Sequence, residues 1–268
     1  MAIDLAELRD VAVRVATEAA ELLAGAVDGE RALVDTKSTS TDMVTEMDRA
    51  SEALLVRRLL ELRPDDGIVG EEGAAHPGTS GVTWVVDPLD GTTNYLYGYP
   101  FWNVSVGAVV EGVPAAGAVV VPALGDVYAG ARALGATRNG TPLRIAPPAP
   151  LATSLVGTGF GYDPAQRVAQ AQALATFVDR IRDVRRGGAA AADLCCVASG
   201  RLDAYYEHGL YDWDRVAGTV IATEAGARVE VLPSEIPGTG RPGDCTVAAH
   251  PDRFDELVEL LAGAGLLG

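Results

Sequence analysis

One short run of the sequence, Val82–Asn94, places strong limits on the local fold of this chain. Its first residues, Val82–Val86, are mostly β-branched and apolar, which predicts a buried strand. Pro88 has no amide hydrogen to donate to a neighbouring strand, so we expect the strand to stop there and the backbone to turn. Gly91 permits a tight bend, and the two threonines that follow it suit the first turn of a short helix. The run therefore predicts a strand, a turn and a helix in immediate succession.

Segments with apolar residues at helical spacing alternate with short β-branched segments along most of the chain, which predicts an α/β fold. We expect the layers to stack as an αβαβα sandwich. The proline-rich run at 147–150 is the clearest break in composition, so we expect an α+β part at 1–148 and an α/β part at 149–268. The expected helices are Ile3–Val27, Met43–Leu62, Pro164–Arg182, Ala189–Ser199, Asp212–Ala225 and Asp252–Ala262. The expected strands are Gly67–Val69, Val82–Val86, Asn103–Glu111, Ala116–Pro122, Asp126–Arg132, Ala136–Arg138, Ser154–Thr158, Asp183–Arg185, Ala204–Glu207, Arg228–Leu232 and Thr246–Ala249, with a hairpin turn at Asn139–Gly140.

The charge balance narrows the range of partners. Among 268 residues, 21 Lys and Arg face 37 Asp and Glu, for a formal net charge of −16. This surplus of acid disfavours nucleic acid as a main ligand, and it repels a phosphate ester unless metal ions reverse the sign inside a site. No apolar run approaches the ~20 residues of a membrane span, so we expect no membrane partner. The three cysteines are an odd number without a C-x-x-C pair, which favours reduced thiols in a cytoplasmic protein.

Acidic residues gather at the ends of the expected elements. Asp87 and Asp90 follow the strand at 82–86, Glu71 follows the strand at 67–69, and Asp48 and Asp214 lie on expected helices. Taken singly, each has an ordinary explanation as a turn residue or a solvated surface acid. Taken together, carboxylates bind hard divalent cations and the backbone amides beside them bind an anionic oxygen, so a cation paired with a phosphate is the natural ligand.

Four motifs, in order along nearly the whole chain, resemble those of the inositol monophosphatase family. Trp84–Asn94 matches the signature W-x-x-D-P-[IL]-D-G-T-[TS]-N without a gap. The second signature matches Trp213–Gly218, and the T-E-A-G run that follows it is Thr223–Gly226. Gly70–Glu72 matches the family's Gly-Glu-Glu. The family's Lys-Ser/Thr loop and its D-x-V-T-x-x-D motif match Lys37–Thr39 and Asp42–Asp48.

The resemblance implies a Mg²⁺-dependent phosphomonoesterase that uses two to three ions, with the metal and phosphate site in the N-terminal part and substrate contacts in the C-terminal part. It implies that the metal ligands are Glu71, Asp87, the Leu89 carbonyl, Asp90 and Asp214. It also implies that Glu71 and Thr92 activate the attacking water, and that the backbone amides of Gly91 and Thr92 hold the phosphate. All-oxygen ligands of this kind suit Mg²⁺, and paired ions clamp the attacking and leaving oxygens of an in-line displacement.

The metal and phosphate residues are common to the family, so they do not select the alcohol. The residues that the resemblance places against inositol are Asp90, Ala190 and Glu207, and Thr93–Asn94 also favours the inositol branch. Glu207 would pair equally well with a cationic histidinol, so histidinol-phosphate phosphatase remains an alternative, as does fructose-1,6-bisphosphate phosphatase. Gly188–Ala189 and Asp212 depart from the commoner family pattern and leave the substrate preference open.

Two further residues have two interpretations each. Lys37 is either an exposed loop residue or a cation that helps to organise the metals near Glu71, and Asp48 either lies behind the metal ligands or serves a weak third ion. The resemblance also implies a homodimer and inhibition by lithium. A hypothesis of a different class is a regulatory protein that binds the transcription machinery, as some bacterial relatives do.

Overall fold

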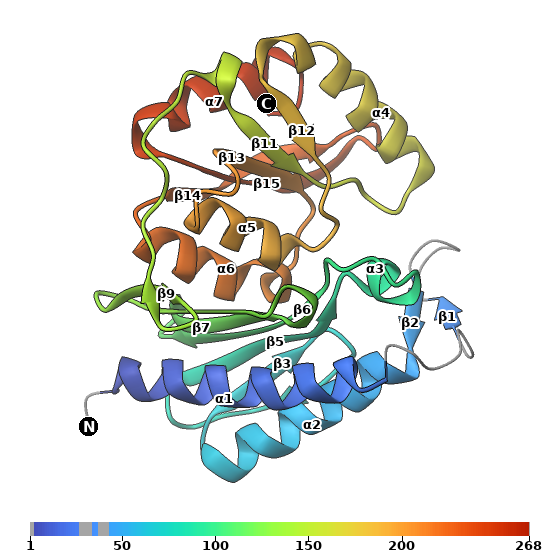
Figure 1. Ribbon diagram of the computed structural model, residues 1–268. Coiled ribbons are helices and arrows are strands. Elements are labelled where there is room, and N and C mark those ends of the chain that lie inside the picture. The colour runs from blue at the N-terminus through green and yellow to red at the C-terminus, as the bar shows by residue number, and fades with distance from the viewer. Residues whose placement is uncertain (1–2, 27–33, 37–42, 268) are drawn as a thin grey trace.

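The computed structural model describes residues 3–26, 34–36 and 43–267, and it consists of alternating helical and sheet layers (Figure 1). The layers confirm the expected αβαβα sandwich: α1 and α2, an eight-stranded sheet, α5 and α6, a five-stranded sheet, and finally α4 and α7. The helices are α1 (Leu5–Ala24), α2 (Glu46–Leu62), α3 (Thr92–Leu96), α4 (Pro164–Ala175), α5 (Ala190–Ala198), α6 (Asp212–Glu224) and α7 (Pro251–Gly263). Among the described helices, none combines the length and the apolar character that crossing a membrane requires.

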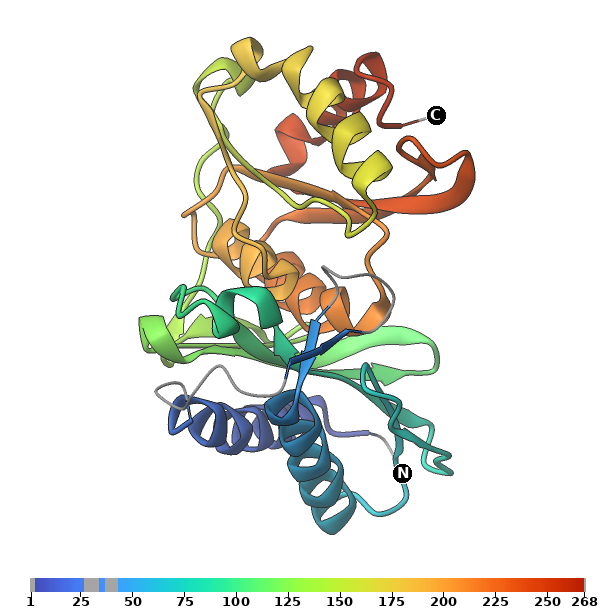
Figure 2. The same cartoon turned by 90° about the vertical axis from the view of Figure 1, so that its right-hand side faces the viewer.

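The first sheet is mostly antiparallel and has the strand order β10-β9-β8-β7-β6-β5-β3-β4, with only β3 and β5 running parallel. Its strands are β3 (Gly67–Gly70), β4 (Ala75–His76), β5 (Val82–Asp90), β6 (Asn103–Val110), β7 (Val113–Val121), β8 (Asp126–Ala131), β9 (Gly135–Arg138) and β10 (Thr141–Pro142). The second sheet, in the order β12-β11-β13-β15-β14, contains β11 (Leu155–Thr158), β12 (Asp183–Arg185), β13 (Ala204–His208), β14 (Arg228–Ile236) and β15 (Arg241–Ala249). A separate antiparallel pair, β1 (Val34–Thr36) and β2 (Met43–Thr45), lies on the same side of the molecule as α3, the side that faces the viewer in Figure 2.

Three apolar clusters fill the spaces between the layers. Below the first sheet, α1 and α2 pack around the fully buried Trp84, whose indole N–H donates to Asp66 at 2.9 Å. The middle cluster joins β7 and β8 to α5 and α6, so it contains residues from both sides of position 148, and the two-part division of the chain stays a prediction. The third cluster packs α7 against the second sheet.

Strand β5 continues past Pro88, so the expected stop at that residue is wrong. Asp87 lies opposite Ser105 of β6 and Asp90 lies opposite Asn103, so β5 advances by one residue more than β6 over this stretch. This offset is a β-bulge, and a bulge tolerates proline because its extra residue stands outside the hydrogen-bonded ladder. The strand therefore extends as far as the second acid of the motif.

Other boundaries differ from the sequence-based expectation by a few residues. The helix expected from Met43 begins at Glu46, because residues 43–45 pair with β1 as a strand. The helix expected to reach Arg182 ends at Ala175, where the chain turns so that Phe177 is buried, and a short 3₁₀ turn follows at Val178–Arg180. The hairpin turn expected at Asn139–Gly140 is confirmed by the pairing of β9 with β10.

Helix α6 approaches the first sheet closely because glycines lie beneath it. A Cβ atom on Gly117 of β7 would lie 2.8 Å from the Cα of Ala217, and one on Gly107 of β6 would lie 2.4 Å from Cγ1 of Val216. Real Cβ atoms do not approach other carbons so closely, so neither position has room for a side chain. This close packing fixes the position of α6, which carries Asp214 at its first turn.

We expect Gly117→Ala to lower the free energy of unfolding by about 1–3 kcal/mol, because the added methyl group forces helix and sheet apart. Urea unfolding followed by circular dichroism measures the change. Gly263→Ala at the end of α7, where nothing lies within 4 Å of the new atom, is the control and should change stability by less than about 0.5 kcal/mol. Equal effects of the two substitutions would contradict the close approach.

Candidate active site

The bulge in β5 turns Asp87 and Asp90 to the same face of the sheet. In a regular strand, residues three apart point to opposite faces. Their partners on β6, Ser105 and Asn103, are two residues apart and share a face, and so do the two acids opposite them. Both carboxylates are buried, and the Leu89 amide within the bulge donates to Asp87 at 3.0 Å.

Asp90 links the bulge to the helix layer above it through hydrogen bonds. Its carboxylate accepts hydrogen bonds from the backbone amides of Ala190 (3.2 Å) and Ala191 (2.9 Å), and from the side-chain amide of Asn103 (2.8 Å). The two backbone amides belong to the first turn of α5, where amide hydrogens have no partner within the helix and a negative charge is favoured. Burial nevertheless raises the pKa of Asp90 to about 6, although the hydrogen bonds from Asn103 and Ala191 lower it.

Glu71 and Asp214 bring two more carboxylates to this place. Glu71 directly follows β3, whose neighbour in the sheet is β5, and Asp214 lies in the first turn of α6, where it accepts the Tyr211 amide at 2.6 Å. Burial raises the pKa of Asp87 well above its ordinary value, and the negative charges of Glu71, Asp90 and Asp214 raise it further. Burial and the charges of Asp90 and Glu71 likewise raise the pKa of Asp214. Four acidic side chains from three separate elements thus interact in one region.

Thr92 lies next to these acids, at the start of α3. Its hydroxyl is 3.0 Å from a carboxylate oxygen of Asp48 and 3.1 Å from the Leu89 carbonyl oxygen, and it donates its single hydrogen to one of them. Gly91 precedes it with φ of 86°, and a side chain there would also press on the Phe101 carbonyl at 3.1 Å. Only glycine combines this backbone conformation with such a close approach. The first amides of α3 are thereby held beside the bulge.

Glu207 belongs to the second sheet, on β13, and its carboxylate is held by the Tyr205 hydroxyl at 2.5 Å. Burial raises the pKa of Glu207 to about 7; the Tyr205 hydrogen bond and the charge of Arg186 oppose this shift, and the charge of Asp90 adds to it. The buried Asp193 of α5 has a pKa raised by burial and by the charges of Glu207 and Asp90. The acidic region therefore extends from the first sheet across α5 to the second.

The four acids have the oxygen ligands and the negative charge that a site for hard cations requires. Within the described residues, no basic side chain forms an ion pair with Asp87, Asp90 or Asp214, and oxygen ligands are those that Mg²⁺ prefers. Within the same residues, no group of three or more His, Cys, Asp or Glu side chains is close enough together to hold a metal ion as it stands. The carboxylates fit a divalent cation in kind and charge.

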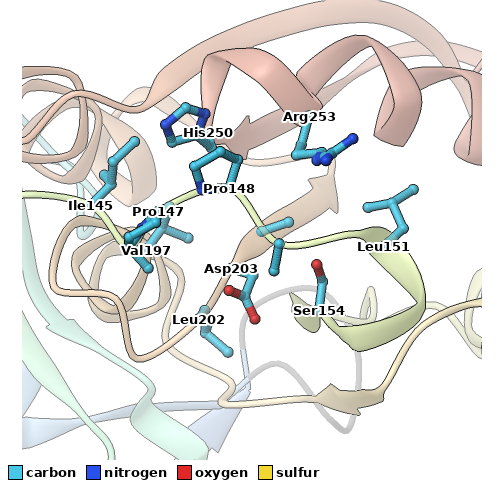
Figure 3. A pocket seen from close by; sticks show the side chains of 13 residues that line it. Ile145, Pro147, Pro148, Leu151, Ser154, Val197, Leu202, Asp203, His250 and Arg253 are labelled. Carbon is cyan, nitrogen blue, oxygen red and sulfur yellow. The ribbon is translucent and has the colours of Figure 1, made fainter.

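Two hollows in the described part of the chain lie away from these acids. The cavity in Figure 3, beside the connection at Pro147–Pro148 and between Leu202 and Arg253, measures about 10 Å³, which is room for about one water molecule. An open groove of about 840 Å³ runs past Val69 and Trp213, but none of the four carboxylates lines it.

The sequence model of the inositol monophosphatase family matches residues 4–264. The chain belongs to this family. It is 47% identical to the inositol-1-monophosphatase SuhB of Mycobacterium tuberculosis, over 96% of this chain and 93% of that protein. A solved structure of Mycobacterium tuberculosis SuhB superposes with a TM-score of 0.84 at 44% identity, covering 99% of this chain and all of the other. The Nus factor SuhB of Haemophilus influenzae is 36% identical over 82% of this chain and 83% of its own length.

Membership of the inositol monophosphatase family makes this protein a phosphatase, in agreement with the resemblance found in the sequence. Of the residues singled out there, Glu71, Asp87, Asp90 and Asp214 interact through their charges, and the Thr92 hydroxyl lies within hydrogen-bond distance of Asp48. Their individual roles stay predictions. Lys37 lies outside the described residues.

The structure adds detail that the motifs did not indicate. The Ala190 amide, expected near a substrate hydroxyl, donates to Asp90, and its contact with substrate stays a prediction. Asn103 and Asp193 belong to the acidic region but were not singled out from the sequence. Asn103 stands outside every matched motif, and Asp193 lies in an alanine-rich helix without other polar residues, so no local pattern marked either one.

The raised pKa of Glu207 predicts a pH-dependent stability. Its folded-state pKa of about 7 exceeds the ordinary value of 4.5, so the fold favours the protonated acid, and this stabilisation is present below pH 4.5 and lost as the pH rises through 7. Between these limits, the unfolding free energy of the wild-type protein in EDTA should fall by about 3 kcal/mol more than that of Glu207→Gln. Tyr205→Phe removes a hydrogen bond that lowers the pKa, so it should move the window to higher pH. Parallel stability curves for wild type and Glu207→Gln in urea unfolding would contradict the assignment.

Proposed function

We propose that this phosphatase hydrolyses inositol monophosphate to inositol and phosphate in a Mg²⁺-dependent reaction. The observation that carries the proposal is the convergence of Glu71, Asp87, Asp90 and Asp214: burial raises the pKa of Asp87, and the negative charges of the other three acids raise it further. Divalent cations would remove this repulsion and would also offset the net charge of −16 for an anionic substrate. When bound, two to three Mg²⁺ ions would supply the Lewis acidity for the phosphate oxygens and the attacking water.

The proposed metal ligands are Glu71, Asp87, the Leu89 carbonyl, Asp90 and Asp214. The amides of Gly91 and Thr92 would hold the phosphate, because amides at the start of a helix lack partners within it. Glu71 would orient the attacking water and accept its proton, with the Thr92 hydroxyl in the same chain of hydrogen bonds. The Asp48 carboxylate and the Leu89 carbonyl both lie within hydrogen-bond distance of the Thr92 hydroxyl, which supports a place for it in such a chain. Lys37 would help to organise metal binding near Glu71.

Glu207 supports a polyol as the alcohol. A carboxylate accepts hydrogen bonds, each hydroxyl of inositol supplies one, and the Tyr205 hydroxyl already orients one of the carboxylate oxygens. Asp90 and Ala190 would contribute to the same contact. Histidinol phosphate and fructose 1,6-bisphosphate remain the alternatives, because a carboxylate also suits a cationic or sugar alcohol. An assay of these phosphate monoesters side by side, with Mg²⁺ present, identifies the preferred one.

Homodimer formation and inhibition by lithium also stay predictions from the family resemblance. A role in transcription is the second hypothesis, and its support is the name of the Haemophilus influenzae relative, a Nus factor. The strongly negative charge of this chain weighs against an RNA-binding form of that role. A pull-down with RNA polymerase and its elongation factors separates the two hypotheses.

We expect Asp90→Asn to lower turnover by roughly a hundredfold or more, because the change removes one of the charges that would hold Mg²⁺. The asparagine oxygen still accepts a backbone amide of α5, so the fold should persist, and thermal unfolding checks this. Asp183→Asn on β12, an exposed acid paired with Arg185, is the matched control and should leave turnover unchanged. Near-normal turnover of Asp90→Asn at saturating Mg²⁺ would contradict the metal assignment.

Glu207→Gln should reduce kcat/KM for inositol phosphate more than for glycerol 2-phosphate. Above pH 7, where Glu207 is charged, loss of this acceptor costs about 1.5–3 kcal/mol, so the specificity ratio should change by about tenfold to a hundredfold. The metal and phosphate groups stay intact for both substrates, which makes the simple ester an internal control. Equal losses on the two substrates would show that Glu207 has a structural role only.

A further inference from the structure

Helix α2 presents three buried polar side chains to the loops that carry the acids. Asp48, Ser51 and Glu52 lie at positions i, i+3 and i+4, so they share one face of the helix. Asp48 contacts the Thr92 hydroxyl, and the Ser51 hydroxyl donates to the Pro88 carbonyl in the bulge at 2.8 Å. The third member of this face, Glu52, reaches the loop after β3.

Glu52 uses both carboxylate oxygens on the backbone around Glu71. One oxygen accepts the amide of Glu72 at 2.8 Å and the other accepts the amide of Ala74 at 3.0 Å. The side chain is only 7% exposed, so these hydrogen bonds replace the water that burial removes. The Glu52 carboxylate therefore fixes the loop after β3 at two positions, the amides of Glu72 and Ala74.

Gly70, the last residue of β3, lies very close to the Glu52 carboxylate. A Cβ atom on Gly70 would lie 2.2 Å from Oε2 of Glu52, so the carboxylate occupies the space where a side chain at position 70 would be. The Gly70 amide donates to the Ala74 carbonyl at 2.8 Å, and the Glu71 amide donates to Val86 of β5 at 3.2 Å. Glu71 is thereby fixed by β5 on one side and by Glu52 on the other.

We propose that Glu52 is a positioning residue that holds the backbone of Glu71 in line with Asp87, and so prepares this pair for a divalent cation. The inference rests on the proposed role of Glu71 as a metal ligand. Glu52 itself has both oxygens engaged by backbone amides, so it acts through the loop and not as a ligand. Groups that orient metal ligands typically contribute tenfold to a hundredfold to metal affinity or activity.

Glu52→Gln tests this role with little change in volume. A glutamine has one accepting oxygen, and its NH₂ group faces an amide hydrogen instead of accepting it, so one of the two bonds is lost. We expect Mg²⁺ affinity, measured by calorimetry without substrate, to fall by about tenfold to a hundredfold. In metal-free protein, hydrogen exchange of the Glu72 and Ala74 amides should become at least about tenfold faster. Glu52→Asp, which keeps the charge but is too short for both amides, should fall between Glu52→Gln and wild type in both measurements.

Two variants separate the possible failures. Glu61→Gln, an exposed acid on the same helix that pairs with Arg58, is the matched control and should bind Mg²⁺ as the wild type does. Glu71→Gln tests the proposed function: normal Mg²⁺ binding by this variant would overturn the metal assignment, and the inference with it. Weak binding by Glu71→Gln together with normal binding and normal amide exchange in Glu52→Gln would overturn the inference alone.

Gly70→Ala tests the same contact from the opposite side, and it serves if Glu52→Gln does not fold. The new methyl group displaces the Glu52 carboxylate, so Mg²⁺ affinity should fall as it does in Glu52→Gln. In the double variant with Glu52→Ala the nearest obstacle is absent and only the milder contact with the Ala74 Cβ at 3.1 Å remains, so Gly70→Ala should add less than about twofold to the loss. Additive losses, which are typical of independent sites, would count against a shared contact, and an unchanged Mg²⁺ affinity in Gly70→Ala would overturn the inference.

Discussion

Two acids three residues apart on a strand point to opposite faces of a sheet, and only the extra residue in β5 turns Asp87 and Asp90 to the same side. Their burial beside Glu71 and Asp214 disfavours the charged forms, which is why the pKa values of both rise. Local hydrogen bonds offset part of this cost: the amide inside the bulge donates to one acid, and the first amides of α5 donate to the other. The bulge thus places the two carboxylates close together in a buried region, and its own amide provides one of the hydrogen bonds that stabilise them.

The same acids also join the layers of the fold. Asp90 connects the first sheet to the start of α5. Asp214 accepts an amide at the start of its own helix, α6, and the neighbouring Trp213 carbonyl joins that helix to the sheet by accepting the Ser105 hydroxyl of β6 at 3.2 Å. Glycines under α6 bring that helix close enough for these contacts. The stability of the middle layer and the geometry of the acidic region therefore depend on shared residues, and a change in one affects the other.

Local patterns in the sequence predicted most of the fold and the acidic residues of the site. Periodicity located the longer helices and strands in the described part of the chain but not the short strands β1, β2, β4 and β10, and the run at 84–94 located the central motif. The bulge was missed because a proline at a strand end resembles a proline in a bulge until the partner strand is known. The spacing of Asp48, Ser51 and Glu52 is visible in the sequence, but the amides that Glu52 accepts belong to a loop whose position depends on the pairing of β3 with β5. Such contacts follow from tertiary packing, which no local pattern contains.

The separation of the acids between two sheets has a consequence for how the substrate range of such an enzyme can change. Asp87 and Asp90 lie on β5 of the first sheet and Glu71 follows its neighbour β3, whereas Glu207 lies on β13 of the second sheet. The two sheets are independent hydrogen-bonded units with α5 and α6 between them. Under the proposed function, substitutions along β13 would alter the alcohol that is accepted while the groups around the phosphate keep their places. One hydrolytic centre would therefore serve many phosphate esters, each selected by the residues on β13.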